Sequence, residues 1–137
     1  MQVEQIAAII AAANLGVSGT TLFVNTMPAT VMNGIVVLPS LSGNQIDWEL
    51  GSRFMNNATF QIIVRVPTDK YRVGYNLAES ISKTLTIQTD TDISAIGTDI
   101  PACKILYMRP KHEIISYPRT QSGYIEFSVN YEMAYIK

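Results

Sequence analysis

Cysteine, histidine and charge are all scarce in this sequence of 137 residues. One cysteine, Cys103, cannot form a disulfide within the chain, and one histidine, His112, gives no support for a zinc site, which needs several such ligands at close spacing. Charged residues make up 15% of the chain, against about 25% in ordinary soluble domains. No apolar run approaches the roughly 20 residues that a membrane-spanning helix needs. A chain of this length can bury one apolar core that needs neither a metal nor a disulfide to support it.

The low charge has two readings that composition alone does not separate. A surface poor in charge suits burial against partner subunits, because charged residues are depleted at the cores of interfaces. It also fits a weakly charged monomer.

The net charge of -1 gives no overall field for binding nucleic acid. The length suits one domain over residues 1–137, and a start without basic residues predicts no signal peptide, so we expect the protein to act where it is made.

Apolar periodicity predicts two helices and several strands. Residues 3–15 and 68–85 repeat apolar side chains at helical spacing, the second through Val73, Leu77, Ile81 and Leu85. Residues 58–66 and 123–135 alternate apolar and polar side chains, as strands with one covered face do. The elements do not alternate strictly, so we predict an α+β fold: an antiparallel or mixed sheet of about four to six strands, with both helices packed on one face and a long hairpin arm.

Residue patterns that would carry chemistry are weak throughout. His112 lies in a predicted turn and is expected to be a solvated surface side chain, and Cys103 begins a predicted strand, which favours a buried, inert thiol. Asp90, Asp92 and Asp99 lack the glycine and terminal glutamate of a calcium-binding loop. Glycine-rich phosphate loops do not occur. We therefore expect no enzyme activity, no cofactor, no metal and no catalytic residue.

The segment 27–57 is rich in glycine, proline, serine and asparagine, yet it carries large apolar side chains. It is predicted to form a long hairpin or arm, because a disordered linker would hold fewer such residues. A hairpin cannot bury this much apolar surface alone, so these side chains must cover the subunit's own core or a neighbouring subunit. The hypothesis that we favour is a subunit interface, formed by Leu41, Trp48, Leu50, Phe54 and Met55.

Parts of residues 27–87 resemble a known family of structural proteins. The resemblance rests on three short segments, which are Gly34-Ile35-Val36-Val37-Leu38-Pro39, Ile46-Asp47-Trp48-Glu49-Leu50 and Phe60-Gln61-Ile62-Ile63-Val64-Arg65. In this the chain is similar to the tail terminators, also called minor capsid, tail completion or head-tail joining proteins, of long-tailed phages. It departs from their pattern at Gly51-Ser52-Arg53, where a turn containing proline is expected.

The resemblance implies a virion protein assembled in the cytoplasm of a bacterial host. Such proteins form a ring, usually a homohexamer, on the head-proximal end of the tail tube. The ring stops the addition of tube subunits, joins the head connector proteins and lets DNA pass through its lumen without sequence-specific binding. The implied partners are thus copies of the same chain, the tail tube protein and the connector.

Two other classes of function stay open at this point. A small-molecule or peptide-binding module without catalysis predicts a monomer with a defined pocket beside the arm. A nucleic-acid-binding domain predicts an affinity that falls steeply with salt. The mass of the protein in solution separates a ring from either of these.

Overall fold

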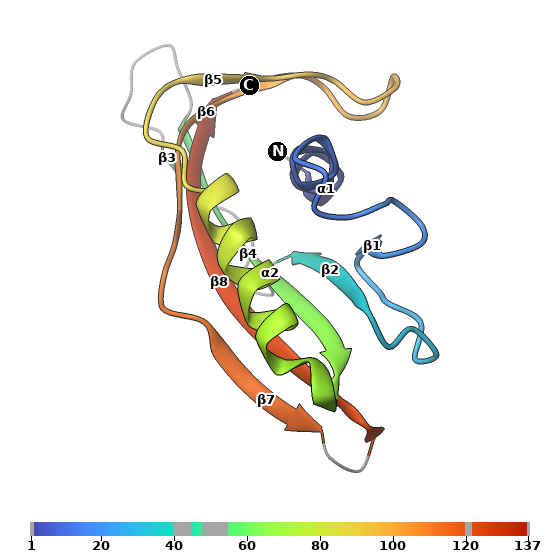
Figure 1. Ribbon diagram of the computed structural model, residues 1–137. Coiled ribbons are helices and arrows are strands. Elements are labelled where there is room, and N and C mark those ends of the chain that lie inside the picture. The colour runs from blue at the N-terminus through green and yellow to red at the C-terminus, as the bar shows by residue number, and fades with distance from the viewer. Residues whose placement is uncertain (1, 40–44, 48–54, 120–121, 137) are drawn as a thin grey trace.

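The computed structural model describes residues 2–39, 45–47, 55–119 and 122–136 (Figure 1). Two α-helices, one short 3-10 helix and eight strands lie within these residues. In chain order the elements are α1 (Val3–Ala12), β1 (Leu22–Val24), β2 (Gly34–Pro39), β3 (Gln45–Asp47), β4 (Met55–Pro67), η1 (Thr68–Lys70), α2 (Tyr71–Thr84), β5 (Thr91–Ile93), β6 (Cys103–Pro110), β7 (Ile115–Arg119) and β8 (Tyr124–Ile136).

The strands form one mixed sheet in the order β1-β2-β4-β8-β6-β5, with β3 paired to β4 and β7 paired to β8. β1 and β2 run parallel, and all other neighbours are antiparallel. The α+β class and the mixed sheet predicted from the sequence are confirmed. The continuous path holds six strands, the upper end of the expected number, and the short β3 and β7 extend it.

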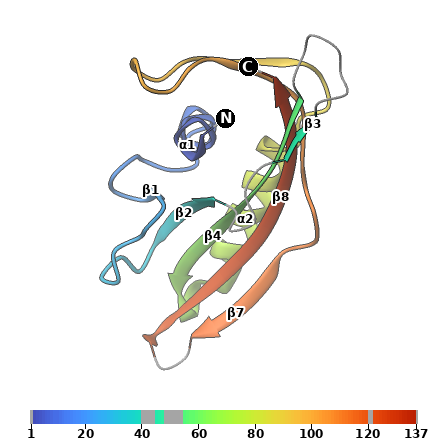
Figure 2. The same cartoon turned by 180° about the vertical axis from the view of Figure 1, so that it is seen from behind.

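Two long strands, β4 and β8, form the centre of the sheet. They pair without interruption from Met55 opposite Ile136 to Pro67 opposite Tyr124. Each has 13 residues, so the pair is about 40 Å long. The sheet curls along this length, and both helices lie inside the curve (Figures 1 and 2). The predicted alternation in both strands is confirmed, because their apolar positions face this concave side and are buried.

Helix α2 lies along β4 and β8, but its contact line differs from the one predicted. The buried side of the helix is formed by Gly74, Ala78 and Ile81, followed by Leu85 just past its end. Val73 is 56% exposed, so its place in the predicted core stripe is wrong. The reason is Gly74, which has no side chain and therefore lets the helix axis approach the sheet closely. A contact line predicted from apolar side chains alone does not include a glycine.

A methyl group at Gly74 would have no room. A Cβ atom there would lie 2.5 Å from Cε2 of Phe127 and 2.6 Å from Cγ2 of Val66, which belong to the two central strands. We expect Gly74→Ala to lower the free energy of unfolding by about 1–3 kcal/mol, because overpacking outweighs the gain in helix propensity. The matched control is Asn76→Ala on the exposed side of α2, which should stabilise the protein slightly. Urea unfolding of both variants tests this, and equal stabilities would contradict it.

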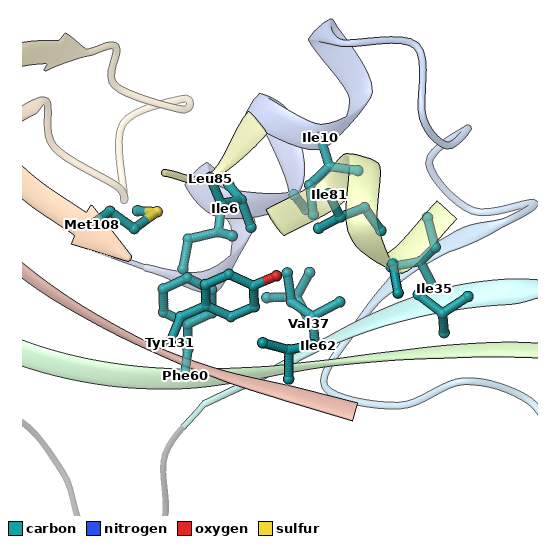
Figure 3. Close-up of a cluster of buried hydrophobic side chains, with 14 of the residues drawn as sticks. Ile6, Ile10, Ile35, Val37, Phe60, Ile62, Ile81, Leu85, Met108 and Tyr131 are labelled. Atoms are coloured by element: carbon teal, nitrogen blue, oxygen red, sulfur yellow. The ribbon is translucent and has the colours of Figure 1, made fainter. Parts of the chain in front are cut away.

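Helix α1 closes the other end of the concave face and carries a buried polar side chain. Ile6 and Ile10 point into the core beside Ile81 of α2 (Figure 3). Gln5 is 1% exposed, and its Nε2 donates to the carbonyl oxygens of Ser94 at 3.1 Å and Pro101 at 3.0 Å. These two bonds hold the two sides of the loop between β5 and β6 against α1. The predicted apolar stripe gave no sign of this role.

The centre of the core is Tyr131 of β8. Its ring stacks on Phe60 of β4 with centroids 5.0 Å apart (Figure 3). Its hydroxyl lies 2.8 Å from the hydroxyl of Ser82 on α2. Tyr131 is fully buried, and this burial raises its pKa to about 12, while the hydrogen bond to Ser82 acts in the opposite direction. One side chain therefore ties both central strands to the helix.

The raised pKa of Tyr131 makes stability depend on pH in the alkaline range. The folded protein keeps the phenol protonated at a pH at which the unfolded chain, with a pKa of about 10, has lost the proton. The contribution is thus complete below pH 10 and is lost as the pH rises towards 12, at up to about 1.4 kcal/mol per pH unit. Tyr131→Phe cannot titrate, so its loss of stability between pH 9 and 12 should be smaller. Parallel pH profiles of the two proteins would overturn this expectation.

Candidate assembly interface

Side chains that could carry chemistry are dispersed or buried. Among the residues that the structure describes, no group of three histidine, cysteine, aspartate or glutamate side chains is placed to hold a metal ion. Cys103 is buried, as predicted, and burial raises the pKa of its thiol, which disfavours the nucleophilic thiolate. Within the same residues, no helix is long and apolar enough to cross a membrane.

His112 is not the solvated side chain that the sequence predicted. It is half-buried and fills a gap along the edge of β8 between the end of β6 and the start of β7. Its Nε2 accepts the backbone N–H of Asn130 at 3.2 Å, and its Nδ1 lies 2.6 Å from the carbonyl oxygen of Glu113. A backbone N–H can only donate, so the ring proton is on Nδ1. The imidazole takes the place of a missing backbone partner in the sheet.

Removing this imidazole should therefore cost more than a surface substitution does. We expect His112→Ala to lower the free energy of unfolding by about 1 kcal/mol, because the Asn130 N–H loses its acceptor. The backbone amide of Asn130 should also exchange its hydrogen faster. Glu113→Ala is the matched control, because that residue contributes a backbone carbonyl and its exposed side chain should matter by less than about 0.5 kcal/mol. Equal stabilities of the two variants would show that the imidazole has no such role.

The predicted arm coincides with strand pairing along one side of β4. β2 pairs with Phe60–Arg65 and β3 with Met55–Asn57, so the two strands follow one another along the same partner. Of the five residues proposed for the subunit interface, Leu41, Trp48, Leu50 and Phe54 lie outside the described residues. The backbone of Met55 belongs to β4, paired with Asp47 and Ile136. Their role as an interface stays a proposal.

Arg65, on the convex face of the sheet, contacts both β8 and the connection between β1 and β2. Its guanidinium lies 3.3 Å from a carboxylate oxygen of Glu126 on β8, directly opposite in register. It also donates to the carbonyl oxygens of Pro28 and Val31 at 3.3 and 3.1 Å, and stands 4.5 Å from the ring centroid of Tyr124. The Arg65 side chain is 12% exposed. It therefore anchors the connection between β1 and β2 onto the two central strands.

Exposed apolar side chains gather at one end of the molecule. Six large ones stand out among the described residues, and four of them come from the start of α2 and from β7; the six are Val17, Tyr71, Val73, Ile96, Ile115 and Tyr117. Tyr71 stacks on Tyr75 with centroids 6.2 Å apart, and the guanidinium of Arg72 lies 5.3 Å from the centroid of Tyr75. Tyrosine and arginine are enriched at protein interfaces, so this end is a candidate interaction surface.

The edges of the sheet at β1 and β7 are poorly suited to pairing with a strand of another molecule. On β8, the backbone N–H and C=O groups of Asn130 point towards the side of the strand where β6 and β7 lie. Because these groups alternate along a strand, those of Ser128 and Glu126 point to the same side, where they face β7. The backbone of Pro118 then faces outward, where it has no N–H to donate. At the opposite edge, Val17 and Gly19 already use the backbone of Leu22. Contacts with partners at these two edges should therefore use side chains.

Comparison with known proteins assigns this architecture. The family model described as "Bacteriophage tail terminator protein" matches residues 9–136. The chain belongs to this family. The match spans both helices and all eight strands except the first turns of α1, so the resemblance seen in residues 27–87 is confirmed over most of the chain. No curated protein matches the chain.

A solved structure shares the fold of this family member. A chain of the "Virion of native gene transfer agent (GTA) particle" superposes with a TM-score of 0.58 and 11% identity, covering 96% of this chain and 84% of that one. At this identity the likeness concerns the fold alone. The family itself is a structural one, and the chain is a component of the phage virion tail.

The residues on which the sequence resemblance rested have structural roles. Phe60 stacks on Tyr131, Gln61 donates to the hydroxyl of Ser128 at 2.6 Å, and Arg65 holds the β1–β2 connection. These three residues therefore hold the central strands and the β1–β2 connection together. The exposed edge at α2 and β7 was missed, because the helical pattern assigned Val73 to the core and gave β7 no distinct signal.

Proposed function

We propose that this chain forms a ring, six-fold as in the proteins that it resembles, at the head-proximal end of the tail. There it ends the polymerisation of tail tube subunits and provides the surface to which the head connector proteins join. DNA passes through the lumen without sequence-specific contacts. The protein acts by assembly rather than by catalysis, and the match to the tail terminator family over residues 9–136 carries the proposal.

The structure supports a role in assembly through its rigidity and its surface. The two central strands pair over their whole length, and the core between sheet and helices is closed by large side chains. Four exposed apolar side chains at one end offer a surface suited to contact with a partner. A rigid subunit with such a surface loses little conformational entropy when it joins a ring.

Tail length is the measurement that tests this function. In a phage carrying a stop codon in this gene, tubes should grow beyond their normal length and should not join to heads. Purified wild-type protein added to growing tubes should cap them and restore a uniform length, as seen by negative-stain electron microscopy. Tyr131→Ala, whose stability is expected to be strongly reduced, is the control and should cap the tubes less well. Tails of normal length that join heads without this protein would overturn the proposal.

A further inference from the structure

The segment that contains β5 and most of the loop after it has a charge unlike that of the rest of the chain. We call residues 88–101 the acidic loop: they contain Asp90, Asp92 and Asp99 and no lysine or arginine. Lys104 lies 3.8 Å from Asp92 and offsets that carboxylate, so two uncompensated negative charges remain, at Asp90 and Asp99. Asp99 sits at the exposed tip beside Ile96, which is 39% exposed. The tip thus offers one apolar side chain next to a carboxylate.

The acidic loop is held in a fixed conformation. Ile96 and Ile100 exchange two backbone hydrogen bonds, of 2.9 and 3.3 Å, around Gly97, whose φ of +59° suits a glycine. Below the tip, Gln5 of α1 binds both sides of the loop through Ser94 and Pro101. A loop ordered in advance loses little entropy on binding, so it suits a docking element.

A surface of opposite character lies at the other end of the molecule. We call it the α2–β7 edge, formed by Tyr71, Arg72 and Tyr75 of α2 with Ile115 and Tyr117 of β7. Arg72 is the one charged side chain among the five residues that define this edge, and its charge is positive. Both views place the acidic loop and β7 at opposite ends of the molecule (Figures 1 and 2).

We propose that adjacent copies of the chain associate head to tail, with the acidic loop of one copy against the α2–β7 edge of the next. This deepens the proposed function, because it rests on the ring and specifies its lateral contact. A ring needs two different, complementary surfaces on each subunit, whereas a two-fold contact pairs a surface with itself and stops at a dimer. The charges favour the first arrangement, since Asp99 meets Arg72 head to tail but would meet like charge in self-pairing. The lack of an N–H at Pro118 agrees with a contact made by side chains.

Paired charge reversals test the contact. Arg72→Glu alone should place a second carboxylate against Asp99, and Asp99→Lys alone should place a second cation against Arg72, so each should weaken association about tenfold or more. In an equimolar mixture, the two variants can alternate around a ring with an even number of subunits. Asp99 of the Arg72→Glu variant then meets Arg72 of the Asp99→Lys variant, and at the next contact the new lysine meets the new glutamate. Every contact thus joins opposite charges. The variant that carries both changes should also assemble. Mass by light scattering, alone and with tail tubes of the same phage, gives the readout.

The controls separate this contact from the ring itself. Lys83→Glu reverses an exposed charge at the far end of α2 and should leave the mass unchanged. Circular dichroism and thermal unfolding should show all variants folded, as expected for exposed positions. Single variants that assemble like wild type, or a double variant that stays monomeric while wild type forms rings, would overturn the head-to-tail contact and leave the ring standing. Wild-type protein that never associates, even on tubes, would overturn both.

Discussion

Replacing Tyr131 by alanine is expected to lower the free energy of unfolding by about 3–5 kcal/mol, which is a large part of the stability of a domain of this size. The side chain is fully buried, stacks on Phe60 and bonds to Ser82, so its removal leaves a cavity where β4, β8 and α2 meet. Urea unfolding with a fluorescence or circular dichroism signal measures the loss.

Two further variants identify the origin of this loss. Tyr131→Phe keeps the stacked ring and removes one hydrogen bond, so it should cost about 1 kcal/mol. Tyr117→Ala removes a tyrosine that is 45% exposed and should change stability by less than about 0.5 kcal/mol. If Tyr131→Phe were as destabilising as Tyr131→Ala, the hydroxyl rather than the packing of the ring would be the main contribution.

Arg65→Ala should cost about 3 kcal/mol, because it breaks a nearly buried ion pair and leaves two carbonyl oxygens without their donor. The β1–β2 connection should loosen at the same time, and hydrogen exchange of the amides of residues 26–33 should become faster. Arg65→Lys keeps the charge but not the planar fork that reaches Glu126 and both carbonyls, so an intermediate loss is expected.

A second arginine on the same face provides the matched control. Arg109 also pairs with a glutamate of β8, Glu132, at 2.6 Å, but the Arg109 side chain is 64% exposed. An exposed ion pair contributes little to stability, so Arg109→Ala should be nearly neutral. Similar losses for Arg65→Ala and Arg109→Ala would show that the network around Arg65 adds nothing beyond a surface ion pair.

Elements with strong local periodicity could be located from the sequence, whereas the pairing of the strands could not. The alternation from Ala58 to Val66 identified β4, and the longer alternation after Gly123 identified β8, because each strand buries one face. The sequence did not predict that β2 and β3 follow one another along β4, or that β6 and β7 do so along β8. Register depends on contacts between distant residues, which periodicity does not report.

The errors in predicting individual residues share a physical cause. Val73 was assigned to the core because it is apolar, yet Gly74 beside it takes the contact with the sheet. Gln5 has no predicted role and His112 is predicted to be a solvated surface side chain, yet each supplies a bond that the backbone of a distant segment requires. Hydrophobicity predicts what is buried on average, but a close approach or a missing backbone partner is set by the tertiary structure.

The central position of β8 has a consequence for biosynthesis. Phe60 pairs with Tyr131, so the contact between β4 and β8 joins segments that lie far apart along the chain. While residues 124–136 are still inside the ribosome, β4 lacks its main neighbour in the sheet, and α2 lacks the part of the sheet surface that β8 provides. Folding is therefore expected after synthesis of this segment, and slowly, as for proteins dominated by contacts between distant residues. Nascent chains are thus expected to reach the folded state that the proposed assembly requires only after β8 has been synthesised.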